Sequence, residues 1–537
     1  MSNRICRSGV AIYLVVIVIA ILSLGAFALF SIITTERHAT TIRGDEIQVR
    51  AAAESGVEFV RMVSAMNELE RARLDGIENN PNIFAGVEVQ SVVRNQRRST
   101  FRFTIVSPNI VDGRLLGVRY GLQNESAKLH LETVLQWELE SPGQGRQALL
   151  ALPRMNPGTA ESILDWIDAD DTPRSSGAEL DYYRRIGVPY GPKNAIPVSL
   201  DELLLVRDVN RSLLFGTDAD FSFGFSLASS NKPDSNSQSE ALNFRPAIPV
   251  PEIPTADLEA LDTTFPAPEI PLQPDDEFPL TDTLVPSLSE ISAEPVTASP
   301  RFPAQSEAGG LPWVHYLTTL SAEKEVNPQG IAKYDLNDSN LEFLQTQIGR
   351  TVDEQAAEFV IQLRQGGLLE TPIDLLTAEI PAMANPFDLK SPEGKTRFYK
   401  LLDYGTTSRD VVITGRININ EAPGEVLRAV PELTDEVVSQ IVSRRRTLSR
   451  DDLRHPVWLF AEELVDATQM QSLWKRITTG GSVYRFQVIG FADNQGTASR
   501  FEVVIDATVR PPRQVFFKDL TMYGGGFPRV VLRPNQE

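Results

Sequence analysis

Five carboxylates are concentrated in one short stretch of the 537-residue chain: Asp165, Asp168, Asp170, Asp171 and Glu179. Calcium binds about six to eight oxygen ligands, often carboxylates on a loop, and the spacing of Asp168 and Asp170 puts two such groups within reach of one ion. The spacing is not that of an EF-hand. The alternative is that these side chains are solvated and stabilise helix termini. Asp165 could cap a helix or pair with a nearby Arg, so we rank it below the other four as a ligand.

The sequence contains no recognisable catalytic set. Its four His are scattered, none of them in a metalloprotease motif, and there is no phosphate-binding Gly-rich loop. The single Cys leaves no partner for a disulfide. The net charge of −20 argues against a broad nucleic-acid surface, because phosphate binding depends on clustered Lys and Arg. We therefore predict a protein that is not an enzyme. A carboxylate pair brought together by the fold, as in hydrolases, stays open.

The elements that must position the carboxylates begin with an N-terminal helix. Residues 10–33 carry no charge, and a helix of that length spans about 36 Å, enough for a hydrocarbon core of about 30 Å. Arg4 and Arg7 precede it, which predicts a single span with a cytoplasmic N-terminus. A cleaved secretory signal would be shorter and would end at a small-residue site, which is missing here. Residues 34–72 lack Pro and carry apolar residues at helical spacing, so we expect the helix to continue.

Strands are predicted on both sides of a mostly helical middle. The patterns indicate strands at 101–106, 115–121 and 128–133, and a hairpin of 484–489 with 500–505. The helical parts would then be insertions into one sheet that packs on the N-terminal helix.

The helical middle repeats itself. Six residues match six others at nearly the same relative positions, and 334–364 resembles a looser third copy; the two sets are Leu149, Leu152, Pro153, Met155, Ala160 and Ile163, and Leu427, Val430, Pro431, Leu433, Val438 and Ile441. Each copy is predicted as helix, tight turn, helix. Helix-hairpin-helix units of this kind grip DNA through a Gly-rich turn, but the turn at 431–436 is acidic and has no Gly. The units are therefore predicted to contact protein rather than DNA.

A linker separates the first two copies. Residues 231–310 hold 14 of the 36 Pro of the chain, with 14 Asp or Glu against 3 Lys or Arg. Such a stretch buries too little apolar surface to offset its ordering entropy. We predict an extended, mobile spacer with some polyproline character, and a binding tail is the alternative.

The N-terminus resembles a known leader. The short basic segment that ends at Gly9, followed by Val10 and the uncharged helix, is similar to the class III leader of type IV pilins and pseudopilins. The resemblance implies that a prepilin peptidase cuts between Gly9 and Val10, removes Cys6 and methylates the new N-terminus. Most of that family has Glu at the fifth mature position, where this chain has Leu14. A carboxylate in lipid needs a cationic partner, which in a filament is the N-terminal amine of the subunit ahead. Absence of the Glu resembles the minor pseudopilin K of type II secretion, which is placed at the end of the filament.

The middle of the chain resembles the same K family. Residues 163–171 (ILDWIDADD) and 177–179 are similar to its most recognisable motif, and further similar stretches are 125–131, 182–183, 189–190, 193–195, 200–207, 417–423 and 426–431. The resemblance covers most of residues 1–215 and 411–510, whereas 230–400 has no counterpart that we can assign. Members of the K family bind calcium in this helical domain. The resemblance therefore favours a calcium site at Asp168, Asp170, Asp171 and Glu179.

The fold class implied is α+β, with a long N-terminal transmembrane and amphipathic helix on a pilin-like antiparallel sheet and large inserted helical domains of SAM-like or helix-hairpin-helix-like type. The expected divisions are a leader (1–9), the N-terminal helix (10–72), the first part of the sheet (73–147), a helical domain with the acidic cluster (148–230), the spacer (231–310), a second helical region with two helix-hairpin-helix-like copies (311–480) and the C-terminal strands (481–537).

The function implied is that of a minor pseudopilin at the tip of the type II secretion pseudopilus. Such a protein supports export across the outer membrane, with its helix in the bacterial inner membrane and its bulk in the periplasm. The implied partners are the I- and J-type minor pseudopilins, the major pseudopilin, the prepilin peptidase, and the secretion substrate or outer-membrane channel. Two alternatives stay open. One is a type IV pilus or DNA-uptake minor pilin whose helix-hairpin units contact DNA, and the other is an uncleaved membrane-anchored periplasmic adaptor.

Overall fold

The computed structural model describes residues 8–89, 100–111, 113–216, 223, 310–381, 383–493 and 496–534, with backbone alone for residues 8–12. Most of the leader and all but the last residue of the spacer predicted at 231–310 lie outside these ranges, so predictions for them are untested. The described elements belong to one structural unit, formed by residues 1–227 and 298–537.

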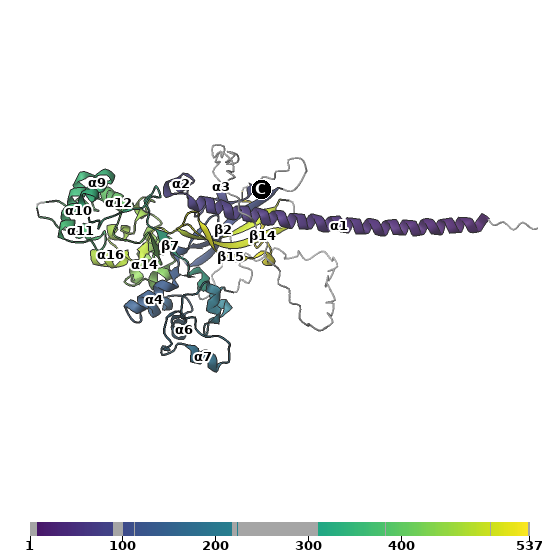
Figure 1. The fold of residues 1–537 in the computed structure, drawn as a ribbon, viewed down its shortest axis with the longest axis horizontal. Coiled ribbons are helices and arrows are strands. Elements are labelled where there is room, and N and C mark those ends of the chain that lie inside the picture. The colour runs from purple at the N-terminus through teal and green to yellow at the C-terminus, as the bar shows by residue number, and fades with distance from the viewer. Residues whose placement is uncertain are drawn as a thin grey trace, which may run out of the picture. The chain divides into compact units, whose positions relative to one another are not determined.

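Helix α1, purple in Figure 1, runs from Ser8 to Ala65. From Tyr13 to Ile33 its large apolar side chains are exposed, and within the described ranges it is the one helix long and apolar enough to cross a membrane. The predicted long apolar helix is therefore confirmed, but its expected extent to residue 72 is wrong. Helix α1 ends because Asn67 starts a new helix, α2 (Glu68–Arg73). The two residues form a capping box, in which the side chains of Asn67 and Glu70 each accept the other's backbone N–H.

A seven-stranded antiparallel sheet combines strands from residues 87–124 with strands from residues 483–519 (Figure 1). Its main path is β1-β2-β13-β14-β15, with β3 paired to β2 and β4 paired to β13. The strands are β1 (Val87–Val89), β2 (Phe101–Val111), β3 (Arg114–Arg119), β4 (Gln123–Asn124), β13 (Val483–Ala492), β14 (Ala498–Asp506) and β15 (Arg513–Asp519). The predicted C-terminal hairpin is confirmed, with Phe486 opposite Val503, and the predicted strand at 101–106 pairs directly with it.

The second half of α1 packs on this sheet at unusually close range. A Cβ atom on Gly490 of β13 would lie 2.0 Å from the carbonyl oxygen of Val49, and one on Gly56 of α1 would lie 2.6 Å from a methyl of Val488. Glycine at both positions lets the two backbones approach. The core between them is apolar and fully buried, with Val60, Ile105 and Phe486 among its members.

Among the residues that the structure describes, three helical units lie between β4 and β13, and each is closed by two short parallel strands. The first unit lies between β5 (Leu129–His130) and β6 (Leu317–Thr318), the second between β8 (Tyr334–Asp335) and β9 (Gly405–Thr406), and the third between β11 (Ile417–Asn418) and β12 (Ile477–Thr478). An antiparallel pair, β7 (Ala322–Lys324) with β10 (Val412–Thr414), connects the segments that follow β6 and β9.

The three closures repeat the same hydrogen bonds. The last residue of the first strand in each pair accepts, with its side chain, the backbone N–H two residues further along the chain; these residues are His130, Asp335 and Asn418. The last residue of the second strand is a Thr whose hydroxyl accepts in the same way; these residues are Thr318, Thr406 and Thr478. Each of these acceptors lies directly opposite its Thr in the strand register. The repeat seen in the sequence thus includes the strands that close each unit.

The helices of the units follow the predicted pattern of helix, tight turn, helix. The first unit has α4 (Leu131–Glu140), α5 (Gln144–Leu150), α6 (Pro157–Ile167), α7 (Leu180–Arg185) and α8 (Arg211–Leu214). The second has α9 (Leu341–Thr351), α10 (Glu354–Gly366), α11 (Asp374–Thr377) and α12 (Pro392–Tyr404). The third has α13 (Gly424–Ala429), α14 (Asp435–Arg444), α15 (Trp458–Ala461) and α16 (Ala467–Trp474). The short helices α3 (Pro81–Phe84) and α17 (Arg529–Leu532) lie beside the sheet segments.

One predicted strand is helical in its second half. Of the segment 128–133, only Leu129 and His130 pair as a strand, because the His130 side chain accepts the N–H of Glu132 and caps α4, which starts at Leu131.

Candidate functional site

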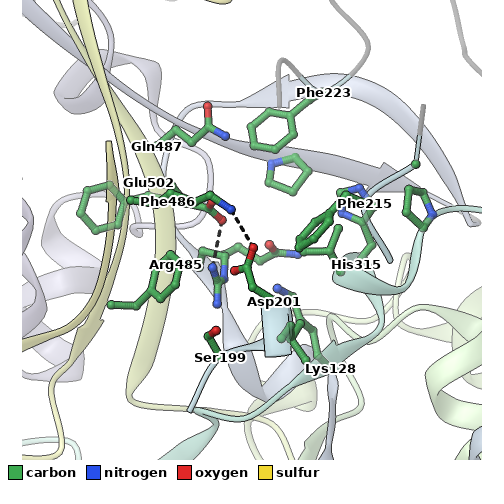
Figure 2. Close-up of a pocket in the computed structure, with 18 of the residues that line it drawn as sticks. Lys128, Ser199, Asp201, Phe215, Phe223, His315, Arg485, Phe486, Gln487 and Glu502 are labelled. Atoms are coloured by element: carbon green, nitrogen blue, oxygen red, sulfur yellow. Dashed lines mark hydrogen bonds and ion pairs between the residues drawn. The ribbon is translucent and has the colours of Figure 1, made fainter. Parts of the chain in front are cut away.

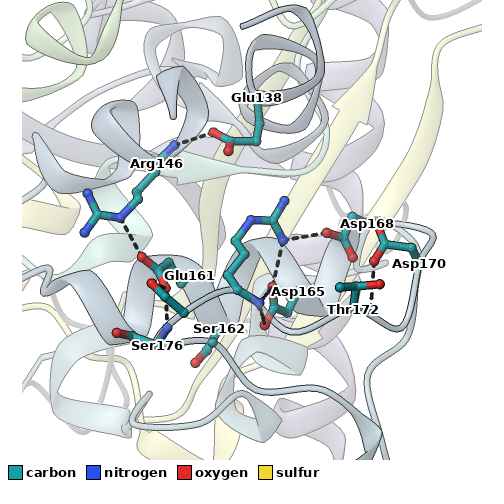
Figure 3. A network of polar contacts seen from close by, with 12 residues as sticks. Glu138, Arg146, Glu161, Ser162, Asp165, Asp168, Asp170, Thr172 and Ser176 are labelled. Atoms are coloured by element: carbon teal, nitrogen blue, oxygen red, sulfur yellow. Dashed lines mark hydrogen bonds and ion pairs between the residues drawn. The ribbon is translucent and has the colours of Figure 1, made fainter. Parts of the chain in front are cut away.

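The acidic cluster is built on the end of α6 and the loop that follows it (Figure 3). Asn156 caps the start of α6 by accepting the N–H of Thr159 at 3.0 Å. The apolar face of the helix, with Ile163 and Trp166, is buried in the core of the helical units. This packing fixes the direction of the helix and brings Asp165 inside the protein, where none of its surface is exposed.

Arg174 binds two of the five carboxylates. Its Nη1 atom donates to Asp165 Oδ1 at 2.7 Å and to Asp168 Oδ2 at 2.5 Å, and its backbone N–H points at Asp165 as well. Burial raises the pKa of both carboxyls, and the guanidinium opposes this rise. Asp165 is therefore held by an Arg, which is the alternative that the sequence analysis left open for it.

Four buried oxygen atoms of the cluster have no hydrogen-bond partner within the described ranges: Asp168 Oδ1, both carboxylate oxygens of Glu179, and Asn194 Oδ1. Glu179 is 3 % exposed. Burial, together with the negative charge of the four Asp side chains, raises the pKa of Glu179 to about 7. Buried acceptors without donors are costly, by about 1–3 kcal/mol each, so the cluster presents oxygen atoms that a cation would satisfy.

Asp170 and Asp171 lie on the exposed part of the loop. Asp170 accepts the N–H of Thr172 at 2.8 Å, and Asp171 accepts from the side-chain amide of Asn194 at 3.1 Å. Among the described residues, no three His, Cys, Asp or Glu side chains are arranged to hold a metal ion. The structure thus gathers hard oxygen donors of the type that calcium prefers, but with Arg174 bound among them.

Sequence reasoning missed two members of the cluster. Arg174 is the one basic residue between Asp165 and Glu179, and this isolated position was a signal that could have been used. Asn194 lies in the segment 193–195 that carried part of the family resemblance, but its contact with the acidic loop depends on the fold.

A second charged cluster lies where the first helical unit meets the sheet (Figure 2). Glu125, fully buried, accepts from Lys128 Nζ at 2.9 Å and from Arg485 Nε at 2.8 Å, and Arg485 also donates to Glu502 at 2.9 Å. These side chains pair with one another beside a cavity of about 90 Å³. His315 also lines the cavity, and burial together with the charge of Lys128 lowers its pKa to about 3. The arrangement connects β13 and β14 to the first helical unit.

The turns of the helix pairs differ from a DNA-gripping turn. Arg154 and Glu432 hold the equivalent left-handed positions, with φ of 60° and 76°. Glycine is the residue that permits this conformation without strain and lets backbone N–H groups approach phosphate. A bulky side chain stands at this position in both turns, and in the third unit that side chain is acidic.

One comparison with known proteins matches the part of the chain that carries the acidic cluster. Residues 139–215 match the family model described as type II secretion system (T2SS), protein K. The matched segment runs from the end of α4 to the residue after α8, and it contains the whole acidic cluster. A comparison with curated proteins gave no match.

Proposed function

The chain belongs to the type II secretion system protein K family by its match over residues 139–215, and we propose that it is the minor pseudopilin at the tip of the pseudopilus. That match carries the proposal. A role in type II secretion follows from the family, whereas the position at the tip is our inference. The role is structural and not enzymatic.

The long helix on an antiparallel sheet supports a pilin-like reading of the fold. The first part of α1 exposes apolar side chains, as a helix in lipid or in a filament would, and the part from Val49 onward packs on β2, β13 and β14. We propose that α1 crosses the bacterial inner membrane with its N-terminus in the cytoplasm, and that the sheet and helical units lie in the periplasm. Cleavage between Gly9 and Val10 by the prepilin peptidase would then release the subunit for assembly.

Leu14 supports a place at the end of the filament. Its side chain is exposed on α1, at the position where filament subunits carry a Glu. A carboxylate there needs the amine of a subunit ahead, so a subunit with none ahead has no use for it. The I- and J-type minor pseudopilins and the major pseudopilin would contact the helix and sheet. The three helical units, which we read as SAM-like or helix-hairpin-helix-like, would face the secretion substrate or the outer-membrane channel.

Calcium fits the chemistry of the acidic cluster. Asp168, Asp170, Asp171 and Glu179 would hold the ion, and the orphaned oxygens of Asp168 and Glu179 are the observation that supports this. The bound ion would supply positive charge to buried carboxylates and so fix the loop 168–179. We expect the melting temperature of the full-length protein in detergent to fall in a chelator. The same fall should be missing in the Asp168→Ala/Asp170→Ala variant. An unchanged melting temperature of the wild-type protein in chelator would leave helix capping as the role of these residues.

Mass spectrometry of the N-terminus tests the proposal most directly. We expect protein from the native membrane to start at Val10 with one added methyl group. A Gly9→Leu variant, made to block the cut, should retain the leader. A wild-type protein with an intact Met1 would overturn the pseudopilin assignment and favour the uncleaved adaptor. Salt-dependent binding of duplex DNA would instead favour the DNA-uptake alternative.

A further inference from the structure

We propose that Arg174 is a built-in competitor of the cation: its guanidinium neutralises the acidic cluster when calcium is absent and releases Asp168 when calcium binds. The inference rests on the calcium site proposed above and concerns its regulation. The guanidinium donates to the carboxylates of both Asp165 and Asp168.

The charges of the cluster leave room for more than one cation. Arg174 brings one positive charge to Asp165 and Asp168, and the cluster holds a third buried carboxylate, Glu179. Asp168 is only half satisfied, since its Oδ2 atom binds Arg174 while its Oδ1 atom is buried and has no partner among the described residues. Within the same ranges, both oxygens of Glu179 also lack a partner. Asp168 stands at the C-terminus of α6, where the helix dipole adds negative potential.

The contacts of Arg174 are unequal, and this makes an exchange possible. Arg174 is anchored to Asp165 by its side chain at 2.7 Å and by its backbone N–H, but it meets Asp168 through one atom. The loop is packed tightly on Asp165, because a Cβ atom on Gly177 would lie 1.9 Å from Asp165 Oδ2. The guanidinium can therefore give up Asp168 and keep Asp165. This assigns separate roles to the two carboxylates, with Asp165 as the anchor of Arg174 and Asp168 as the group that Arg174 and calcium share.

The test is a calcium titration of full-length protein in detergent, by isothermal calorimetry, for the wild type and Arg174→Gln. Removing the competitor should lower the Kd for calcium by about tenfold or more, because a charge that opposes the ion at contact range is lost. Relative to the wild type, the melting temperature of Arg174→Gln should be lowered more in chelator than in saturating calcium. Arg146→Gln is the matched control. Arg146 of α5 pairs with Glu161 of α6 at 2.8 Å and makes no ion pair with the five carboxylates of the cluster, so its loss should leave the Kd within about twofold.

Each outcome decides something. An unchanged or higher Kd in Arg174→Gln would overturn the competitor role, while calcium binding by the wild type would keep the proposed site. Absence of calcium binding in both proteins would overturn the site itself and this inference with it. If Arg174→Gln folds only in calcium, the competitor role is supported, because the guanidinium is then needed in the metal-free state alone. If it folds in neither condition, Arg174→Lys replaces it. The compact ammonium of the lysine should bridge the carboxylates less well than the guanidinium does. The Arg174→Lys variant should therefore bind calcium more tightly than the wild type, and an equal Kd would refute the inference.

Discussion

His315 should make the protein sensitive to mild acid. Its side chain lines the cavity where the first helical unit meets the sheet, and the residue is 9 % exposed. Burial, with Lys128 nearby, lowers the pKa of the imidazole to about 3. The folded protein therefore holds His315 neutral, while the unfolded chain takes up a proton near pH 6.5. The stability that depends on the neutral form is complete above pH 6.5 and is lost as the pH falls from there towards 3.

The size of this loss at pH 5 follows from the unfolded state. Between pH 6.5 and pH 5 the unfolded histidine gains the proton over about 1.5 pH units, and each unit is worth about 1.4 kcal/mol. The free energy of unfolding should therefore be about 2 kcal/mol lower at pH 5 than at pH 8 through this residue alone. The value depends little on the folded pKa, because at pH 5 a group with a pKa of about 3 is still almost wholly neutral.

Urea unfolding of full-length protein in detergent at pH 5, 6, 7 and 8 would measure this, for the wild type and for His315→Gln. The free energy of unfolding of the wild type minus that of His315→Gln should decrease by about 2 kcal/mol as the pH falls from 8 to 5. Burial also lowers the pKa of His130 and His455, but these residues contribute equally to both proteins. Leu368→Ala, which changes an exposed side chain that does not titrate, is the control and should keep the wild-type slope. Parallel pH profiles for the wild type and His315→Gln would refute the reasoning.

Three further predictions concern backbone packing and can be read from unfolding free energies. Gly490→Ala should destabilise the protein by at least about 1–3 kcal/mol, because its Cβ would lie 2.0 Å from a carbonyl oxygen of α1, whereas Gly496→Ala, with open space around it, should be neutral within about 0.5 kcal/mol. Gly177→Ala should cost about 1–3 kcal/mol, since the added methyl meets a buried carboxylate at 1.9 Å, and a stability equal to wild type would show that the loop can move away. Arg154→Gly should gain about 0.5–1 kcal/mol by removing left-handed strain at φ 60°, but Glu432→Gly should gain nothing, because it also loses a hydrogen bond of 2.6 Å to a serine hydroxyl.

The sequence carried enough information for the elements whose periodicity spans many residues. The uncharged run, the strand at 101–106 and the C-terminal hairpin were predictable because long apolar or alternating patterns leave few other solutions. The end of α1 and the start of α4 were not predicted, because each depends on one capping side chain, Asn67 or His130, that competes with the surrounding propensity. The repeat was visible as helices, but the strands that close each unit have two residues each and no pattern of their own.

The acidic cluster shows the same division between local and distant information. The carboxylates were visible because they are close in sequence. The burial of Asp165, Asp168 and Glu179 was not, because it results from the packing of α6 and its loop in the core of the helical units. The distinction between Asp165 and Asp168 needed Arg174, whose side chain reaches back over the loop by a route that spacing alone does not reveal. The spacing of the carboxylates therefore predicted where the cluster lies in the sequence, whereas the separate roles of Asp165 and Asp168 could be assigned only from the fold.

The topology explains how the sheet tolerates three inserted helical units. The chain leaves the sheet at Asn124 and returns at Val483, and the two points are neighbours, since Asn124 pairs with Tyr484. Loop closure becomes only slowly more costly with length, so an insertion between residues 124 and 483 need not separate β4 from β13. The buried contact of Glu125 with Arg485 lies at this junction and ties the first residue of the insertion to the returning strand. Because breaking one partner of such a buried pair leaves an uncompensated charge, the junction is fixed by electrostatics as well as by strand pairing.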